Sequence, residues 1–217
     1  MKKILKHLVI LWLLFMLVAV GGITFKGYQL YKEAVSSVSL ETKFEEMKQG
    51  EHYTNYEELP EIYIQAVISV EDKRFFQHPG IDVKSICRAI IHNIQAGALV
   101  EGGSTITQQL AKNLYFDQEK SFLRKIAEVF MAFDIEGHYT KKEIFEWYVN
   151  TIYFGEGYYG IGSACLGYYG KEPEAMTDEE AMTLAGIPNA PSLYNPRANQ
   201  ELCRERMLQV KRAMENY

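Results

Sequence analysis

The sequence predicts a mainly α-helical domain preceded by one membrane-spanning helix. Three features indicate this fold class: an apolar run near the N-terminus, apolar residues at helical spacing further on, and no long stretch with the alternating pattern of a β-strand. The 217 residues suffice for one ordinary domain and an anchor. We therefore expect a single domain after the anchor and no second catalytic domain.

The membrane-spanning helix is predicted from the beginning of the chain. Lysines precede an apolar run at residues 8–25, which only Thr24 interrupts. These 18 residues form a helix of about 27 Å at a rise of ~1.5 Å per residue, close to the ~30 Å hydrocarbon core of a bilayer. The lysines before the run place the N-terminus in the cytoplasm and the domain outside. A cleavable signal peptide is the alternative, and it exports the domain as well.

The chain divides into three predicted regions. Residues 1–25 form the cytoplasmic tip and transmembrane anchor, residues 26–57 a polar juxtamembrane stem, and residues 58–217 the globular domain. Helix ends are recognisable along that domain. Pro60 suits the first turn of a helix whose buried face ends at Glu71. Asp82 suits the cap of the next helix, which Gly97 ends. Its apolar residues recur at helical spacing, which predicts a core helix, and they are Val83, Ile86, Ile90 and Ile94.

Further helix signals follow in the second half of the chain. The glycine-rich loop at 101–103 leads into Ser104 and Thr105, N-cap candidates for a helix that continues to about Leu114. Residues 140–143 and 177–180 match the capping box, in which side chains of the first turn satisfy exposed backbone donors. A segment rich in turn residues then precedes a last helix that ends near Tyr217. The domain is therefore predicted to be helical almost throughout.

Charge and cysteine content exclude two other classes of protein. The net charge of -5 lacks the basic footprint of nucleic-acid binding, so no nucleic acid is expected among the partners. Cys87, Cys165 and Cys203 are odd in number and form no CxxC pair, which argues against a disulfide framework and against a zinc site. We expect buried free thiols, because Cys87 and Cys165 lie among apolar or small residues.

Chemically active side chains gather where the first helix of the domain ends. Residues 71–80 bring two carboxylates, a Lys-Arg pair, aromatic rings and a histidine to the junction of an apolar helix and a turn. Apolar walls raise the pKa of a carboxyl group toward the range that is useful for proton transfer. The alternative is a charged helix end paired with its own Lys73 and Arg74, and spacing alone leaves both interpretations open.

Residues 102–113 read GGSTITQQLAKN, and through this segment the chain resembles glycosyltransferase family 51. Members of that family polymerise lipid II into glycan strands, alone or as the first domain of bifunctional penicillin-binding proteins. The resemblance covers about residues 58–217, and several separated motifs stand in the family's order.

The family motifs are met residue by residue. The first, Glu-Asp-x-x-Phe-x-x-His-x-Gly, is met by Glu71, Asp72, Phe75, His78 and Gly80. The second is met by residues 103–109 with Lys112 and Asn113, and the third, Arg-Lys-x-x-Glu, by Arg124, Lys125 and Glu128. The fourth is met by Lys141, Ile144, Glu146, Tyr148 and Asn150, with Phe145 and Val149 in place of leucines. The C-terminal motif departs most: Arg206, Val210 and Met214 fit, whereas Met207 and Lys211 replace an arginine and an apolar residue.

The resemblance implies a lysozyme-like helical fold with a small, mobile jaw beside the plasma membrane. It also implies a reaction in which the 4-hydroxyl of an incoming lipid II attacks the anomeric carbon of the growing lipid-linked strand. The product is a β-1,4 link formed with inversion, and undecaprenyl pyrophosphate departs. The alcohol must lose its proton, and the charge of the leaving group must be neutralised. Implied partners are lipid II, the glycan strand, the membrane and cell wall synthesis proteins.

The resemblance assigns the catalytic base to Glu71 and a second essential glutamate to Glu128. Glu128 is expected to organise the donor pyrophosphate with a divalent cation, Mg²⁺ or Mn²⁺, and no organic cofactor is expected. Arg124 and Glu128 are four residues apart and share a helix face, with Lys125 on its flank, so that a phosphate meets two cations. Lys112 adds a third cation.

Other residues are expected to contact the substrate or to support the site. The predicted substrate contacts are Asp72, Phe75, His78, Gly103, Ser104, Thr105, Gln108, Gln109 and Asn113, together with the three cations. For His78 a structural role competes with that assignment and is favoured, because a histidine in such a turn satisfies local carbonyls. Glu146 and Asn150, again four apart, are expected to form a buried polar brace.

Two other functions compete with the transferase. A lysozyme-like muramidase is the first, because a glutamate at a helix end is also the acid of glycan hydrolysis. A hydrolase does not need the cations Lys112, Arg124 and Lys125. The second is a membrane-tethered binding or scaffold protein that has lost catalysis, and the presence of Glu71 and Glu128 argues against it.

Overall fold

The computed structural model describes residues 2–116 and 121–217. Within these ranges the chain is built from helices, and its β-structure is limited to a single bridge between Tyr153 and Tyr159. This confirms the predicted fold class, a mainly α domain with one long apolar helix at the N-terminus.

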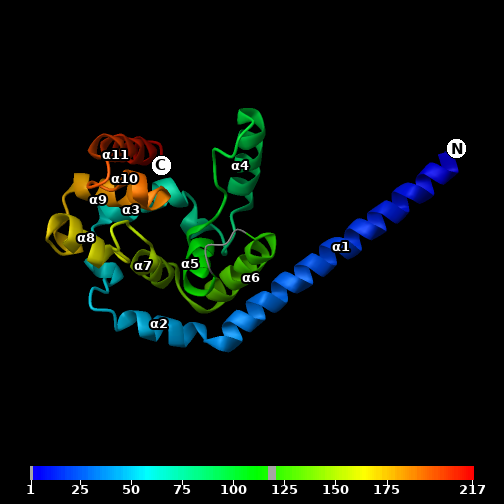
Figure 1. The fold of residues 1–217 in the computed structure, drawn as a ribbon, viewed down its shortest axis with the longest axis horizontal. Coiled ribbons are helices and arrows are strands. Elements are labelled where there is room, and N and C mark those ends of the chain that lie inside the picture. Colours follow the sequence, from blue (N-terminus) through cyan, green and yellow to red (C-terminus); the bar gives the residue numbers. More distant parts are fainter. Residues whose placement is uncertain (1, 117–120) are drawn as a thin grey trace.

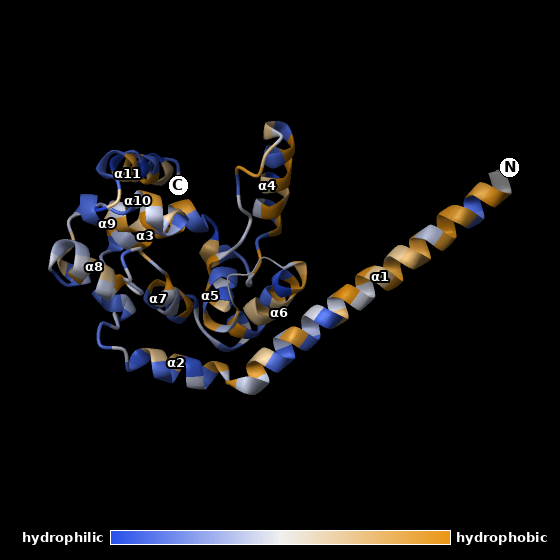
Figure 2. Cartoon of the chain, in the orientation of Figure 1, coloured by the Kyte–Doolittle hydropathy of each residue, from blue (hydrophilic) through white to orange (hydrophobic). Residues whose placement is uncertain are grey.

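α1 (Lys2–Ser37) projects from the domain as a long rod (Figure 1). It contains a segment long and apolar enough to cross a membrane, and Figure 2 shows apolar residues dominating its distal half. The predicted anchor therefore lies in a helix suited to that purpose. The helix does not stop at residue 25, however, and continues without interruption into the first part of the predicted stem. The domain boundaries themselves stay predictions.

The predicted stem packs against the domain. Phe44 of α2 (Leu40–Lys48) is buried and stacks on Trp147, with ring centroids 3.4 Å apart. The hydroxyl of Tyr31 donates a hydrogen bond to Asp134 of α6 (Phe122–His138) at 2.7 Å. The segment from the end of α1 through α2 thereby contributes buried side chains to the core of the domain.

Gly27 allows the close approach of α1 to α6. A Cβ at this position would lie 2.4 Å from Cγ2 of Ile126 and 2.7 Å from its Cβ. We expect Gly27→Ala to destabilise the protein by about 1–3 kcal/mol through overpacking. Gly22→Ala is the matched control, because nothing lies within 4 Å of a Cβ at residue 22. Thermal unfolding in detergent checks this, and equal unfolding temperatures for the two variants would contradict the close packing.

The remaining helices follow along the chain, and all but α4 form the body of the domain. They are α3 (Glu61–Glu71), α4 (Val83–Ala96), α5 (Ile106–Tyr115), α7 (Lys141–Thr151), α8 (Ile161–Tyr169), α9 (Asp178–Gly186), α10 (Pro191–Tyr194) and α11 (Gln200–Glu215). Short 3₁₀ turns lie at Tyr56–Glu58, Phe75–Gln77, Pro173–Ala175 and Ile187–Asn189. α3 packs against α9 and α11, while α5 packs against α6 and α7. The core therefore has two parts, one around α3 and one around α5. The first two motifs, which lie at the end of α3 and the start of α5, meet between these parts.

The predicted helix ends are confirmed. Asp82 caps α4 by accepting a hydrogen bond from the backbone N–H of Ser85 at 3.0 Å, and Gly97 ends that helix in the left-handed conformation with φ 62°. Thr105 caps α5. The two predicted capping boxes are also formed, at the starts of α7 and α9.

α4 is not the core helix that its apolar spacing predicts. Val83, Ile90 and Ile94 are 60%, 53% and 74% exposed, and within this helix only Ala89 is buried. α4 stands apart from the other helices, with apolar residues along its length (Figure 2). Helical spacing of apolar residues shows that a helix has an apolar face, but not what covers that face. For the same reason the prediction of a buried Cys87 is wrong, whereas Cys165 and Cys203 are buried as expected.

Candidate active site

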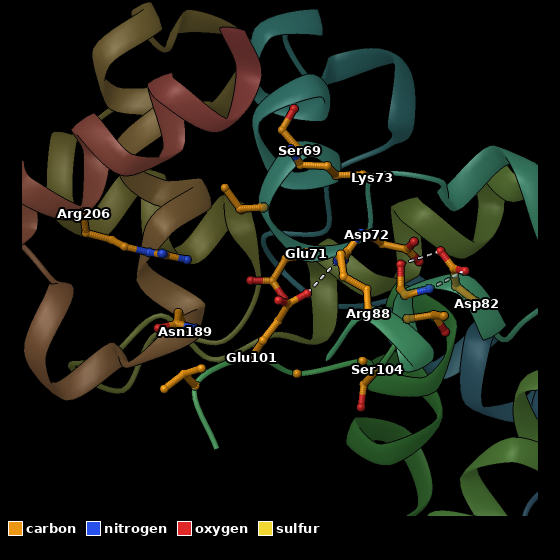
Figure 3. Close-up of a pocket in the computed structure, with 16 residues that line it drawn as sticks. Ser69, Glu71, Asp72, Lys73, Asp82, Arg88, Glu101, Ser104, Asn189 and Arg206 are labelled. Carbon is orange, nitrogen blue, oxygen red and sulfur yellow. Dashed lines mark hydrogen bonds and ion pairs between the residues drawn. The ribbon is translucent and has the colours of Figure 1, made fainter. Parts of the chain in front are cut away.

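A cleft of about 450 Å³ opens at the C-terminal end of α3 (Figure 3). Its walls come from the start of α4, from the glycine-rich segment before α5, from Asn189 and from α11. The lining includes five predicted site residues, Glu71, Asp72, Gly103, Ser104 and Thr105. The first two motifs therefore meet at one cavity, although about 30 residues of chain separate them.

Glu71 is the last residue of α3 and lies half-buried at this cleft. Its Oε2 accepts a hydrogen bond from Nε2 of Gln109 at 2.8 Å. Burial raises the pKa of Glu71, and the hydrogen bond from Gln109 and the charges of Arg206 and Lys112 oppose that rise. A carboxyl group with a raised pKa is suited to accept a proton in the reaction. This is the environment that the sequence predicts for a base.

Gln109 connects this cleft to a second cavity. Gln109, Lys112 and Asn113 line a neighbouring space of about 340 Å³, together with Tyr153 and Tyr159. The other end of the Gln109 amide accepts a weak hydrogen bond from the hydroxyl of Tyr148 at 3.3 Å. The predicted base thus borders one cavity, and the residue that binds its carboxylate borders the other.

Glu128 gathers two of the predicted cations. Its Oε1 accepts a hydrogen bond from Nε of Arg124 at 2.9 Å, and its Oε2 accepts one from Nζ of Lys125 at 2.7 Å. Nζ of Lys125 also donates to Oγ of Ser104 at 2.7 Å. Lys125, which the sequence places on the flank of this helix face, therefore contacts Glu128 as well. A spacing of three residues on a helix brings side chains together as a spacing of four does. Glu128 is only 1% exposed, so its charge is compensated inside the protein.

Lys112 joins the same electrostatic cluster from α5. Burial lowers the pKa of Lys112, and the carboxylate of Glu128 opposes this effect. Arg124 and Lys125 lower it further, while Glu71 raises it. Three cations on α5 and α6 therefore interact with two carboxylates, Glu128 of α6 and Glu71 at the end of α3. Such a cluster is suited to receive an anion of more than one charge.

Among the described residues, one group of potential metal ligands is Asp72, His78 and Asp82. All three are buried, and each has a ligand atom that already has a partner, although Nδ1 of His78 has none. Nε2 of His78 lies 3.0 Å from both oxygens of Asp72, and Nε of Arg74 donates to Asp82 at 2.9 Å. Burial alone raises the pKa of Asp82, but hydrogen bonds from Arg74 and Ser85 outweigh it and hold the pKa well below its usual value. The group fits an internal charge network better than a metal site.

The predicted metal ligand Glu128 does not fit a metal either. Both of its carboxylate oxygens accept hydrogen bonds from cationic side chains, Arg124 and Lys125. A divalent ion bound there would lie close to two side-chain cations, and their repulsion opposes its binding.

Several predicted substrate contacts lie behind the walls of the cleft. Phe75 is fully buried, and Lys141 Nζ lies 4.4 Å from the centre of its ring. His78 is buried against Asp72, and Gln108 forms the capping box with Thr105. These side chains hold the motif segments against one another. Their predicted contacts with substrate stay predictions, whereas the structural role favoured for His78 agrees with this geometry.

The predicted brace of Glu146 and Asn150 is formed, although both residues are half-buried rather than buried. Glu146 accepts hydrogen bonds from the hydroxyl of Tyr53 and from the backbone N–H of Tyr56, the latter at 2.8 Å. Asn150 accepts from the N–H of Thr54 at 3.0 Å and donates to its carbonyl at 2.8 Å. The brace ties α7 to the segment that leads into α3.

Sequence reasoning did not assign to the site four lining residues whose side chains carry donor nitrogens: Lys73, Arg88, Asn189 and Arg206. Arg206 comes from α11, which lies more than 130 residues after Glu71 in the chain. Its match to the C-terminal motif of the resembled family was the signal that pointed to it. The other three carry no such mark.

A half-buried carboxylate at a cleft, next to a cluster of cations on a helical domain, has the chemistry expected of an enzyme that transfers a proton beside an anionic group. The family model described as Transglycosylase matches residues 33–215, which is most of the chain. The chain belongs to this transglycosylase family. The match begins inside the predicted stem, in agreement with the packing of that segment on the domain.

Penicillin-binding proteins are among the relatives of this chain. It is 40% identical to penicillin-binding protein 1F of Bacillus subtilis (strain 168) over 216 residues, which is 94% of this chain and 30% of the relative. It is 46% identical to penicillin-binding protein 1A of Neisseria lactamica over 154 residues, 71% of this chain and 19% of the relative. The chain thus spans less than a third of the length of these relatives.

Proposed function

We propose that this chain is a peptidoglycan glycosyltransferase that polymerises lipid II into β-1,4-linked glycan strands. The observation that carries the proposal is the pairing of one proton-accepting carboxylate, Glu71, with a cluster of three cations on the adjacent helices. The carboxylate suits the attacking alcohol, and the cations suit a diphosphate leaving group. Membership of the transglycosylase family supports this assignment.

In the proposed reaction Glu71 removes the proton of the 4-hydroxyl of the incoming lipid II as the oxygen attacks the anomeric carbon. The bond from that carbon to the pyrophosphate oxygen breaks, with inversion, and undecaprenyl pyrophosphate leaves. Lys112, Arg124 and Lys125 stabilise its charge, and Glu128 holds the last two in place. At an effective dielectric constant of about 20, a cation ~4 Å from a phosphate is attracted by ~4 kcal/mol before desolvation.

Enzymes of this family commonly need a divalent cation. Two of the described carboxylates that could hold such an ion are already paired with cations. Glu128 is paired with Arg124 and Lys125, and Asp82 is paired with Arg74. The proposed mechanism therefore assigns neutralisation of the leaving group to the protein's own cations, and none of its steps depends on a metal ion.

We further propose that the domain lies on the outer face of the plasma membrane, where lipid II and the growing strand reside together with other cell wall synthesis proteins. The lysines before the apolar part of α1 favour a cytoplasmic N-terminus. The exposed apolar residues of α4 support an orientation in which this helix is the jaw beside the bilayer. In Figure 1, α4 and the distal part of α1 both project away from the body of the domain.

This location makes a direct prediction. The chain should fractionate with membranes, and protease added outside spheroplasts should digest the domain that follows residue 26. Protection from the protease would contradict the orientation. Release of a shortened chain into the medium, after cleavage near Gly21, would favour the signal-peptide alternative instead.

The proposed activity is tested with purified protein and labelled lipid II. The expected result is a ladder of glycan polymers on a gel, which collapses to disaccharide units when a muramidase is added. A protein that leaves lipid II unchanged but cuts preformed glycan would be a muramidase. A protein that binds lipid II without converting it would be a binding protein.

A further inference from the structure

Arg206 lines the cleft, and the proposed reaction gives it no role. It lies on α11 and reaches toward the space beside Glu71 (Figure 3). α11 packs against both α3, which carries Glu71, and α9. The position of this guanidinium relative to the proposed base is therefore set by the packing of the core.

The side chain of Arg206 is held from several directions. Its Nε donates to the carbonyl of Gly186 at 3.3 Å, and its Nη1 donates to Gln209 at 3.1 Å. The guanidinium carbon lies 5.7 Å from the centre of the Tyr194 ring. A Cβ at residue 186 would lie 2.9 Å from Cγ of Arg206, so glycine is needed there for this approach. A cation held in this way presents its charge to the cleft from a fixed place.

The surroundings of Glu71 oppose its ionised form as well as supporting it. Burial and the neighbouring Asp72 raise the pKa of Glu71, whereas the hydrogen bond from Gln109 and the charges of Arg206 and Lys112 lower it. Other titratable groups surround the cleft: Tyr63 of α3, Lys73 in the turn after α3, Asp82 and Arg88 from the start of α4, Glu101 before α5 and Tyr148 of α7. The two tyrosines are fully buried, with pKa values well above the usual range, and so stay neutral.

Two cations, Lys112 and Arg206, favour the ionised form of Glu71, and they differ in their other interactions. Lys112 belongs to the cluster proposed to bind the diphosphate, so bound substrate compensates its charge. Arg206 lines the cleft from α11, whereas Lys112 lines the second cavity, and no ion pair between described residues joins Arg206 to the cluster around Glu128. We propose that Arg206 is a positioning residue, which keeps Glu71 ionised and ready to accept the proton while the leaving group occupies the other cations. This inference rests on the proposed role of Glu71 as the base.

The test is the pH dependence of lipid II polymerisation by Arg206→Gln, Arg206→Lys and the control Arg204→Gln, an exposed arginine on the same helix outside the cleft. Removal of a cation raises the pKa of a nearby carboxyl group, so the base stays protonated up to a higher pH. For Arg206→Gln we expect the acidic limb of kcat, which reports the enzyme with substrate bound, to move up by about one pH unit. Turnover on that limb should be roughly tenfold slower and should recover at higher pH. Arg206→Lys should restore most of the shift, and Arg204→Gln should match the parent.

A second measurement does not depend on activity. The carboxyl band of Glu71 is identified by infrared difference spectra between the parent and Glu71→Gln, and its titration is then followed in Arg206→Gln. An upward shift of that titration supports the inference. An active Glu71→Gln protein overturns the proposed base instead, and with it the inference, whatever the titration shows. An unchanged titration overturns it, as does a rate that falls equally at every pH, because Arg206 would then only support the packing of α11.

Discussion

Glu71→Gln is expected to abolish polymerisation and to leave the fold intact. The amide keeps the shape of the side chain, and its oxygen can still accept the hydrogen bond from Gln109. What is lost is the ability to accept a proton, and general base catalysis is typically worth ~10²–10⁴-fold in rate. The measurement is the initial rate of lipid II polymerisation, with circular dichroism to confirm the helical fold.

The matched control for this variant is Glu61→Gln at the other end of α3. Glu61 is exposed and hydrogen-bonds to Gln65 in the first turn. Its neutralisation removes the same charge from the same helix without touching the cleft, so the rate should stay near that of the parent. A folded Glu71→Gln protein that keeps more than about a tenth of the parent rate would show that Glu71 is not the base.

The second large effect is expected from the cations. Lys112→Ala and Arg124→Ala should each slow polymerisation by roughly 30- to 1000-fold, which corresponds to about 2–4 kcal/mol of lost transition-state stabilisation. Both side chains interact with the buried carboxylate of Glu128, so their charges act in a partly dry site. A muramidase that acts on uncharged glycosidic bonds should be far less sensitive, and digestion of preformed glycan provides that comparison.

Lys48→Ala is the control for a surface charge. Lys48 forms an exposed pair with Glu45 at 3.8 Å, and such pairs contribute about 0–1 kcal/mol. Its rate should change little. If Lys112→Ala and Arg124→Ala also lose less than about fivefold, these residues carry ordinary surface charges and the leaving group is stabilised elsewhere.

Much of the fold was predictable because its signals are local. The cap at Asp82, the left-handed glycine at 97 and the capping boxes of α7 and α9 each depend on a few neighbouring residues. The motif residues were predictable for another reason, since their spacing matches a family. The structure adds the contact between Glu71 and Gln109, which the sequence does not indicate.

The errors concern long-range packing. The spacing of Val83, Ile90 and Ile94 identifies an apolar face, but a face turned away from the core has the same pattern as one turned toward it. Cys87 was predicted to be buried for the same reason and is exposed, because it lies on the same helix. Arg206 enters the cleft only because α11 packs on α3, and a charged residue on a C-terminal helix gives no local sign of that.

In the proposed reaction, Glu71 and the cation cluster together catalyse the joining of lipid II units, and each joining step releases a diphosphate. The most direct measurement counts undecaprenyl pyrophosphate released against disaccharide units joined, in one reaction with labelled lipid II. One diphosphate is expected for each new linkage, and both counts should be lost together in Glu71→Gln. Soluble fragments cut from preformed glycan, with no diphosphate released from lipid II, would contradict it.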